Sequence, residues 1–179
     1  MRIISGKWGG RRISPPTNMP HTRPTTDIAR EGLFNILQNR MDFDGIKTLD
    51  LFGGTGCISY ELGSRGAAEM TIIEKDNTMH AFIKKNLDML GAANAKVLKM
   101  DVFSYLNTCN EPFDFIFAGP PYALGSIDEL PKIIVARKLI AKSGFFVLEH
   151  TPRNQYEKSA GFSFMRNYGT TLFSFFVGE

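Results

Sequence analysis

Short apolar runs alternate with amphipathic stretches through most of this 179-residue chain. The apolar runs predict buried strands at about 46–52, 70–74, 96–100, 113–118 and 144–149. Helical spacing of apolar residues predicts helices at about 57–66, 77–90, 102–106 and 130–141. Strands that alternate with helices are typical of a parallel sheet with crossover helices, so the pattern predicts an α/β fold.

The two ends of the chain depart from this alternation. A helix is expected from the capping residues 25–27 to about Met41, and the aromatic segments 162–165 and 172–177 predict an antiparallel hairpin. Residues 1–24 are rich in Gly, Pro and basic side chains, which do not make a hydrophobic core by themselves. We therefore expect a basic N-terminal arm, with at most a short strand pair, over residues 1–24, and one domain over residues 25–179.

Composition is ordinary, with 43% hydrophobic and 22% charged residues, as in a soluble globular protein. No apolar run is long enough to span a membrane, and no secretory signal is visible. The two cysteines, Cys57 and Cys109, lack metal-ligand spacing, so we expect small apolar fillers, no metal site and reduced thiols in the cytoplasm.

Charge is distributed unevenly. The first 40 residues carry a net charge of +5, and the remainder carries −2. A basic arm on a slightly acidic body indicates a polyanionic partner, although a solubilising terminus is the alternative. Trp8 could stack on a base or anchor the arm, and Arg30 could face a ligand or the solvent. The candidate residues for contacting the phosphates of such a partner are Arg2, Lys7, Arg11, Arg12, Arg23 and Arg30.

The clearest candidate site is the segment from Lys47 to Gly56, where an apolar strand ends in a glycine-rich turn. Such a turn often binds a pyrophosphate, but the carboxylate of Asp50 would repel one and suits a cationic ligand. The dinucleotide fingerprint also fails, because Ser59 stands where its last glycine should be. These features favour S-adenosylmethionine over a nicotinamide cofactor and make a dehydrogenase a distant alternative.

Two further acids follow the next two predicted strands. Glu74 stands where an acid commonly binds ribose hydroxyls, and Asp101 is placed to accept a hydrogen bond from an adenine amino group. Asp101 alone could be only a helix cap. Three acids at three consecutive strand ends together indicate one ligand crevice.

The fourth strand leads into Gly119-Pro120-Pro121-Tyr122. The prolines fix the backbone and remove two N–H donors, which predicts rigid, unpaired carbonyls beside an aromatic ring. This is a candidate platform for the group that is modified.

Together these motifs resemble those of class I S-adenosylmethionine-dependent methyltransferases that act on exocyclic amino groups. Segments 2–12, 23–27 and 30–35 are similar to the bacterial small-subunit ribosomal RNA guanine-N2 methyltransferases called the RsmD family. The resemblance implies a Rossmann-like, seven-stranded, mostly parallel sheet with an antiparallel C-terminal strand. It also implies an enzyme that acts on 16S ribosomal RNA or the assembling 30S subunit. Because a small basic enzyme would act here on a large substrate, we expect a monomer.

The resemblance also assigns site residues. The residues expected at the cofactor are Asp50, Phe52, Gly53, Gly54, Gly56, Glu74, Asp101 and Val102. Those expected at the methyl-transfer step are Gly119, Pro120, Pro121 and Tyr122. The basic arm is expected to hold RNA.

One position departs from the family pattern, which has Asp or Asn where this chain has Gly119. That side chain accepts a hydrogen bond from the target amino group, and losing it should cost about 1.5–3 kcal/mol if the acceptor was charged. We expect a slower enzyme, not an inactive one. The alternatives are an adenine-N6 or protein-amide methyltransferase, and a catalytically weakened RNA-binding homologue.

Overall fold

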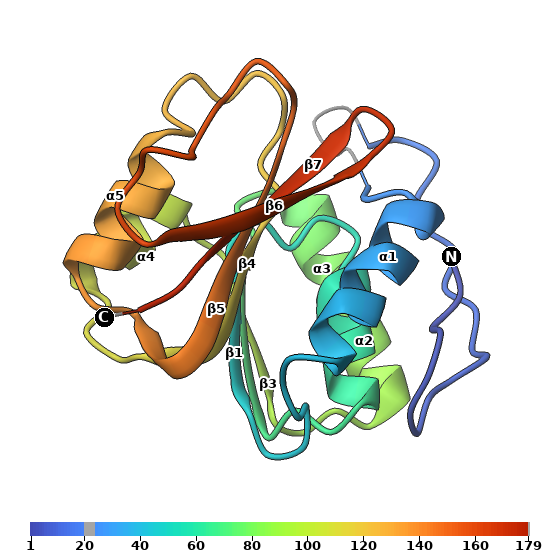
Figure 1. Ribbon diagram of the computed structural model, residues 1–179. Coiled ribbons are helices and arrows are strands. Elements are labelled where there is room, and N and C mark those ends of the chain that lie inside the picture. Colours follow the sequence, from blue (N-terminus) through green and yellow to red (C-terminus); the bar gives the residue numbers. More distant parts are fainter. Residues whose placement is uncertain (20–23, 179) are drawn as a thin grey trace.

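One twisted sheet forms the centre of the computed structural model, which describes residues 1–19 and 24–178 (Figure 1). Within these residues the sheet has seven strands in the order β3-β2-β1-β4-β5-β7-β6. Neighbours from β3 through β5 are parallel, whereas β7 is antiparallel to both β5 and β6. The strands are β1 (Lys47–Asp50), β2 (Glu69–Ile73), β3 (Ala95–Leu98), β4 (Phe113–Ala118), β5 (Ile140–His150), β6 (Phe162–Tyr168) and β7 (Thr171–Phe176). The α/β fold and the antiparallel hairpin predicted from the sequence are confirmed.

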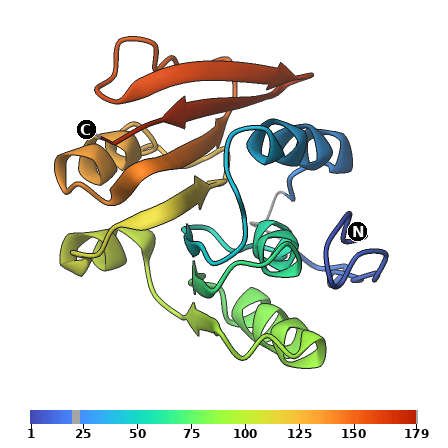
Figure 2. The same cartoon turned by 60° about the horizontal axis from the view of Figure 1, so that its bottom comes forward.

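Helices cover both faces of the sheet. The first three helices lie on one face, and the last two lie on the other (Figures 1 and 2). They are α1 (Asp27–Gln38), α2 (Cys57–Ser64), α3 (Asn77–Leu90), α4 (Val102–Thr108) and α5 (Glu129–Ala136). No helix in the described ranges is long and apolar enough to cross a membrane.

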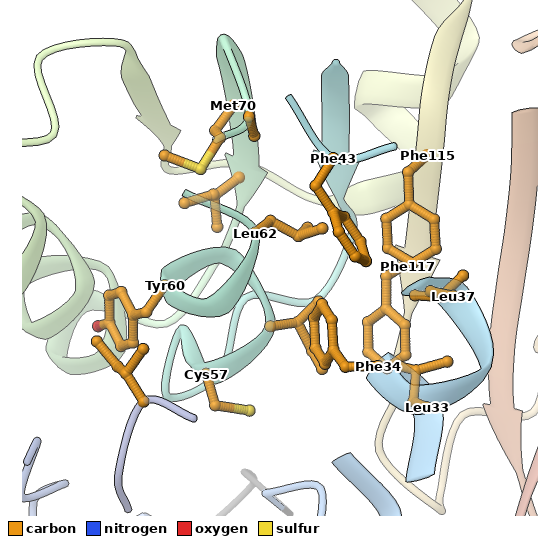
Figure 3. Close-up of a cluster of buried hydrophobic side chains, with 14 of the residues drawn as sticks. Leu33, Phe34, Leu37, Phe43, Cys57, Tyr60, Leu62, Met70, Phe115 and Phe117 are labelled. Atoms are coloured by element: carbon orange, nitrogen blue, oxygen red, sulfur yellow. The ribbon is translucent and has the colours of Figure 1, made fainter. Parts of the chain in front are cut away.

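Alternate residues of β4 show how one strand serves both layers. Phe115 and Phe117 belong to the cluster that includes side chains of α1 and α2, whereas Ile116 and Ala118 belong to the cluster beneath α4 and α5. Figure 3 shows Phe117 next to Phe34 and Leu33 of α1. Successive strand side chains point to opposite faces, so a continuous apolar run is what a sheet covered on both sides requires.

The predicted helix over 130–141 is wrong at its C-terminal end. The helix α5 ends at Ala136, and Lys138 adopts a left-handed conformation with φ of 56° that turns the chain. Ile140 then pairs with Phe113, so β5 begins well before the predicted residue 144. The apolar residues 139–141 fit a helix and a buried strand equally well, and pairing with β4 decides between them.

The N-terminal arm is packed more firmly than its composition suggested. Arg2 and Arg12 form a single antiparallel bridge, which agrees with the short strand pair. Ile3, Trp8 and Ile13 are at most 5% exposed and belong to the cluster that contains α1 and α2. The arm therefore makes no core of its own but adds three spaced apolar residues to the core of the domain, which agrees with the anchoring role considered for Trp8.

Candidate active site

The site lies at the point where the chain changes direction across the sheet. From β1 the chain continues through β2 to β3 at one edge, whereas β4 returns to the other side of β1 and leads to β5. Ligands in such sheets bind in the crevice at the carboxyl ends of the strands beside this switch point. Asp50, Glu74 and Gly119 stand at or just after those ends.

The glycine turn is held against the end of β2. The N–H of Gly53 donates to the carbonyl of Ile73 at 3.0 Å, and the N–H of Gly54 donates to Oε2 of Glu74 at 2.8 Å. A Cβ on Gly53 would lie 2.7 Å from the Ile72 side chain, so a larger residue would push the turn away. Gly56 has φ of 84° and caps α2. Glycine is needed here both for close approach and for a left-handed backbone.

Asp50 is the most unusual carboxylate of the site. Its side chain is buried at 2% exposure, and Oδ2 accepts a hydrogen bond from Ser59 at 3.0 Å. Burial raises the pKa of Asp50 to about 7, and the Ser59 hydrogen bond offsets only part of this rise. Oδ1 is buried with no hydrogen-bond partner in the described residues, as is Oγ1 of Thr55. An unsatisfied buried acceptor beside a glycine turn fits a ligand that carries a cation.

Glu74 and Asp101 both contact backbone. The two oxygens of Glu74 accept from the N–H groups of Gly54 and Asp76, which fixes the carboxylate over the turn. Oδ2 of Asp101 accepts from the N–H of Ser104 at 3.1 Å, so Asp101 does cap α4. Both acids keep lone pairs for further donors. Their contacts to ribose and adenine stay predictions.

Phe52 and Val102 were also predicted at the cofactor. Both pack with the hydrophobic cluster beneath α4 and α5, and Val102 is only 6% exposed. Phe52 lies two residues after the end of β1, and Val102 is the first residue of α4, which follows β3. Their contact with the cofactor stays a prediction.

The loop after β4 presents the predicted platform. Tyr122 is 59% exposed, so much of its ring faces the solvent. The carbonyl of Pro121 accepts a hydrogen bond from the N–H of Leu124 at 3.0 Å, so the prediction of unpaired carbonyls is wrong at this residue. A pocket beside the loop is lined in part by Pro120, Tyr122 and Glu149.

Glu149, the penultimate residue of β5, was missed by the sequence reasoning. It is 1% exposed, and Oε2 accepts a hydrogen bond from Oγ1 of Thr25 at 2.6 Å. The same oxygen lies 3.1 Å from the position that a Cβ on Gly119 would occupy. An acid at the end of a strand was the signal that identified Asp50, and it was present at Glu149 as well.

Four of the six predicted RNA-binding residues lie on the surface of the arm. Arg2, Lys7, Arg11 and Arg12 are exposed on the arm, whereas Arg23 lies outside the described residues.

Arg30 is 2% exposed, so the alternative that it faces the solvent is wrong. A contact with a ligand stays a prediction. Its Nη2 donates to the carbonyl of Arg2 at 2.8 Å and to Asp27 at 3.2 Å. It therefore joins the arm to α1.

The sheet order, the acid that ends β1 and the glycine turn after it define the fold of a class I methyltransferase. The chain belongs to the family described as conserved hypothetical protein 95, whose model matches residues 1–177.

A relative in Escherichia coli K12, the ribosomal RNA small subunit methyltransferase D, is 34% identical over 86% of this chain and 76% of its own length. A solved hypothetical protein of Thermus thermophilus is 27% identical, with a TM-score of 0.86 and 99% of each chain covered. The 16S rRNA N2 G1207 methyltransferase RsmC of T. thermophilus, solved with AdoMet and guanosine, is 26% identical with a TM-score of 0.69. The match covers 87% of this chain and 44% of that one.

Proposed function

We propose that this protein transfers a methyl group from S-adenosylmethionine to the exocyclic N2 amino group of a guanine in 16S ribosomal RNA. The observation that carries the proposal is the unsatisfied Oδ1 of Asp50, buried beside a glycine turn on a strand where Asp50 pairs with Phe117, two residues before the loop that begins at Gly119. A relative that is a small-subunit rRNA methyltransferase and a similar structure solved with AdoMet and guanosine support it.

The chemistry of the donors fits the cofactor. S-adenosylmethionine supplies an electrophilic methyl group on a sulfonium centre and carries an ammonium group. Asp50 offers the negative charge and the free acceptor for these cations, and the backbone of Gly53 and Gly54 allows close approach. Glu74 and Asp101 would bind the ribose hydroxyls and the adenine amino group.

The loop over residues 119–122 would hold the target base. The exposed ring of Tyr122 offers a face on which an extruded guanine can stack, a contact worth about 1–3 kcal/mol. The carbonyl of Gly119 or Pro120 would accept one hydrogen bond from the amino group and orient its nitrogen. No strong base is needed, because the nitrogen becomes acidic once it is alkylated and its proton can leave to water.

The basic arm would contribute affinity for the RNA backbone. Its four exposed cations, at positions 2, 7, 11 and 12, are fixed to the body of the enzyme through the buried residues of the arm. Cations that contact phosphates position a nucleic acid without reading its sequence. We propose that a cytoplasmic monomer acts on naked ribosomal RNA or on the assembling 30S subunit.

Transfer of tritium from labelled S-adenosylmethionine tests the proposal. Purified protein is incubated with small ribosomal subunits, protein-free 16S RNA or DNA, and the nucleosides are then separated by mass. We expect label in N2-methylguanosine from one of the two ribosomal substrates. Label in adenine, in protein or in DNA would contradict this substrate and show that the methyl acceptor is another amino or amide group. Cofactor binding without transfer to any of them would indicate an RNA-binding homologue.

Ribosomal RNA from cells without the gene offers an independent test. Mass mapping should find one guanine that has lost a methyl group, and this also identifies the target nucleotide. An unchanged set of modifications would contradict the proposal.

A further inference from the structure

The chain lacks a side chain at residue 119, yet a carboxylate reaches that place from the neighbouring strand. In the β4–β5 ladder Ala118 pairs with Leu148, so the next residues, Gly119 and Glu149, are side by side. Oε2 of Glu149 lies 3.1 Å from the position of a Cβ on Gly119. A glycine is the residue that leaves room for this approach.

We propose that the carboxylate of Glu149 accepts the hydrogen bond from the target amino group that a side chain at residue 119 cannot accept. The proposal rests on the proposed function and names a catalytic residue for it. An exocyclic amino group has two N–H donors, and the backbone of the loop after β4 can satisfy one. Glu149 satisfies the other from a position that borders the same pocket as Pro120 and Tyr122.

The hydrogen bond between Thr25 and Glu149 supports this role. At 2.6 Å it orients the carboxylate, and a carboxylate can accept several hydrogen bonds at once. Thr25 immediately precedes Thr26, the N-cap of α1, so the contact also ties the start of that helix to the site. A carboxylate held in this way need not reorganise when the base binds.

A negative charge at this position helps most during the transfer itself. The nitrogen forms a bond to the methyl carbon while the bond between that carbon and sulfur breaks, and the electron pair stays on the sulfur. The nitrogen becomes positive until one of its protons leaves to solvent. Because Glu149 interacts more strongly with the cationic nitrogen than with the neutral one, it lowers the barrier instead of only binding substrate.

Four variants test the assignment. Glu149→Gln keeps the size of the side chain and an acceptor for Thr25, and we expect its turnover to fall 10- to 100-fold with the KM for the cofactor unchanged. Gly119→Asp alone should also be slow, because its carboxylate would crowd that of Glu149. The double variant Gly119→Asp/Glu149→Ala should turn over at least 10-fold faster than Glu149→Ala, because the acceptor returns from β4.

A merely structural role would give a different pattern. If Glu149 only anchors Thr25, then Glu149→Gln keeps that anchor and should turn over like wild type, a result that would overturn the assignment. A double variant no faster than Glu149→Ala would overturn it too. Cofactor affinity measured by calorimetry, together with thermal unfolding, shows that each variant is folded.

RNA binding without cofactor gives a second readout. Inosine lacks the N2 amino group, so wild type should bind a target RNA more tightly with guanine than with inosine at the modified position. Glu149→Ala should lose this preference, and an unchanged preference would contradict the contact. Wild type that methylates no guanine would refute the proposed function itself, whereas an active wild type beside an equally active Glu149→Gln variant would refute this assignment alone.

Discussion

Ser59 on α2 donates a 3.0 Å hydrogen bond to Oδ2 of Asp50 at the end of β1. The contact fixes one oxygen of the carboxylate and leaves Oδ1 buried without a partner in the described part of the chain. A buried, incompletely satisfied acid costs stability, and such costs are typical of functional sites. The ionisation of Asp50 should therefore affect folding and ligand binding in opposite directions.

The stability of the ligand-free protein should depend on Asp50 between about pH 4 and pH 7. Its folded pKa is about 7 against 3.8 for the unfolded chain, so the folded state binds more protons and stability falls as pH rises through this window. We expect Asp50→Asn to stabilise the protein by up to about 4 kcal/mol above pH 7 and by little near pH 4. Urea unfolding across this pH range measures the difference, and a difference that does not change with pH would contradict the raised pKa.

Cofactor binding should show the opposite dependence on Asp50. The cationic ligand favours the ionised form, so affinity should rise between pH 6 and pH 8, with proton release at neutral pH. Asp50→Asn should bind the cofactor at least about 10-fold more weakly at pH 8 and release fewer protons. Calorimetry in two buffers of different ionisation enthalpy counts the protons. Titration of the ligand itself contributes equally in wild type and in Asp50→Asn, so the difference in proton release between them reports the ionisation of Asp50.

Glu61 should be the main electrostatic anchor of the N-terminal arm. Its fully buried carboxylate accepts hydrogen bonds from the N–H groups of Ile4 and Ser5, at 2.8 and 3.1 Å, and from Arg65 at 2.9 Å. Replacing it with Ala leaves these donors without their partner, which should cost about 3–5 kcal/mol. Limited proteolysis should then cut the arm first.

Glu129→Ala is a matched control for that change. Glu129 pairs with Lys132 on the surface of α5, where 54% of its side chain is exposed. Such a pair is worth about 0.2–1 kcal/mol, so this variant should unfold like wild type. If Glu61→Ala lowered the free energy of unfolding no more than Glu129→Ala does, the buried contacts of Glu61 would contribute little to stability.

Trp8 should stabilise the fold and not stack on RNA. A Cβ on Gly63 would lie 2.8 Å from the Trp8 ring and 2.8 Å from Met70, so Gly63→Ala should cost about 1–3 kcal/mol despite the better helix propensity of alanine. In a Trp8→Phe background the smaller ring should relieve part of that cost. The control is Gly125→Ala, where no atom lies within 4 Å of the added methyl. Equal costs of Gly63→Ala in both backgrounds would contradict the contact.

Tyr122 should contribute to kcat/KM for RNA and not to affinity for the cofactor. Tyr122→Ala removes the exposed ring, and loss of stacking predicts a fall of roughly 5- to 150-fold in kcat/KM for RNA. Tyr122→Phe keeps the ring and should stay close to wild type, and cofactor affinity should not change in either variant. Normal turnover by Tyr122→Ala would remove the stacking role.

The exposed cations of the arm should set the salt dependence of RNA binding. Replacing Arg11 and Arg12 together should reduce the slope of log K against log salt by about 1.4–1.8 if each contacts one phosphate. Lys142→Ala, an exposed residue near the start of β5 and away from the carboxyl ends of the strands, is the control and should leave the slope unchanged. An unchanged slope in the arginine variant would place RNA elsewhere on the surface.

The sequence predicted the sheet well because its strands are buried on both faces. The bounds of α3 and β4 agree with the prediction, because Gly91 ends α3 and turn residues flank β4. The three acids were placed at one edge because parallel strands with crossover helices all end there. Gly119 was identified as a departure because the resembling family has Asp or Asn at that position.

What the sequence did not reveal depends on contacts between distant residues. Thr25 and Glu149 are 124 positions apart, and no local pattern indicates that their oxygens meet. Arg30 reads as a surface charge on α1, and only the docked arm explains its burial. Trp8 could have served either role until its neighbour Gly63 was known.

Ser64, the last residue of α2, accepts hydrogen bonds from the backbone N–H groups of Lys7 and Trp8, at 2.8 and 2.9 Å. A Cβ on Gly6 would lie 1.9 Å from the Ser64 carbonyl oxygen, so the two segments fit each other closely. If the arm were exchanged between homologous enzymes, the new arm would contact an α2 helix to which it does not fit. A functional chimera should therefore take both the arm and α2 from the same enzyme.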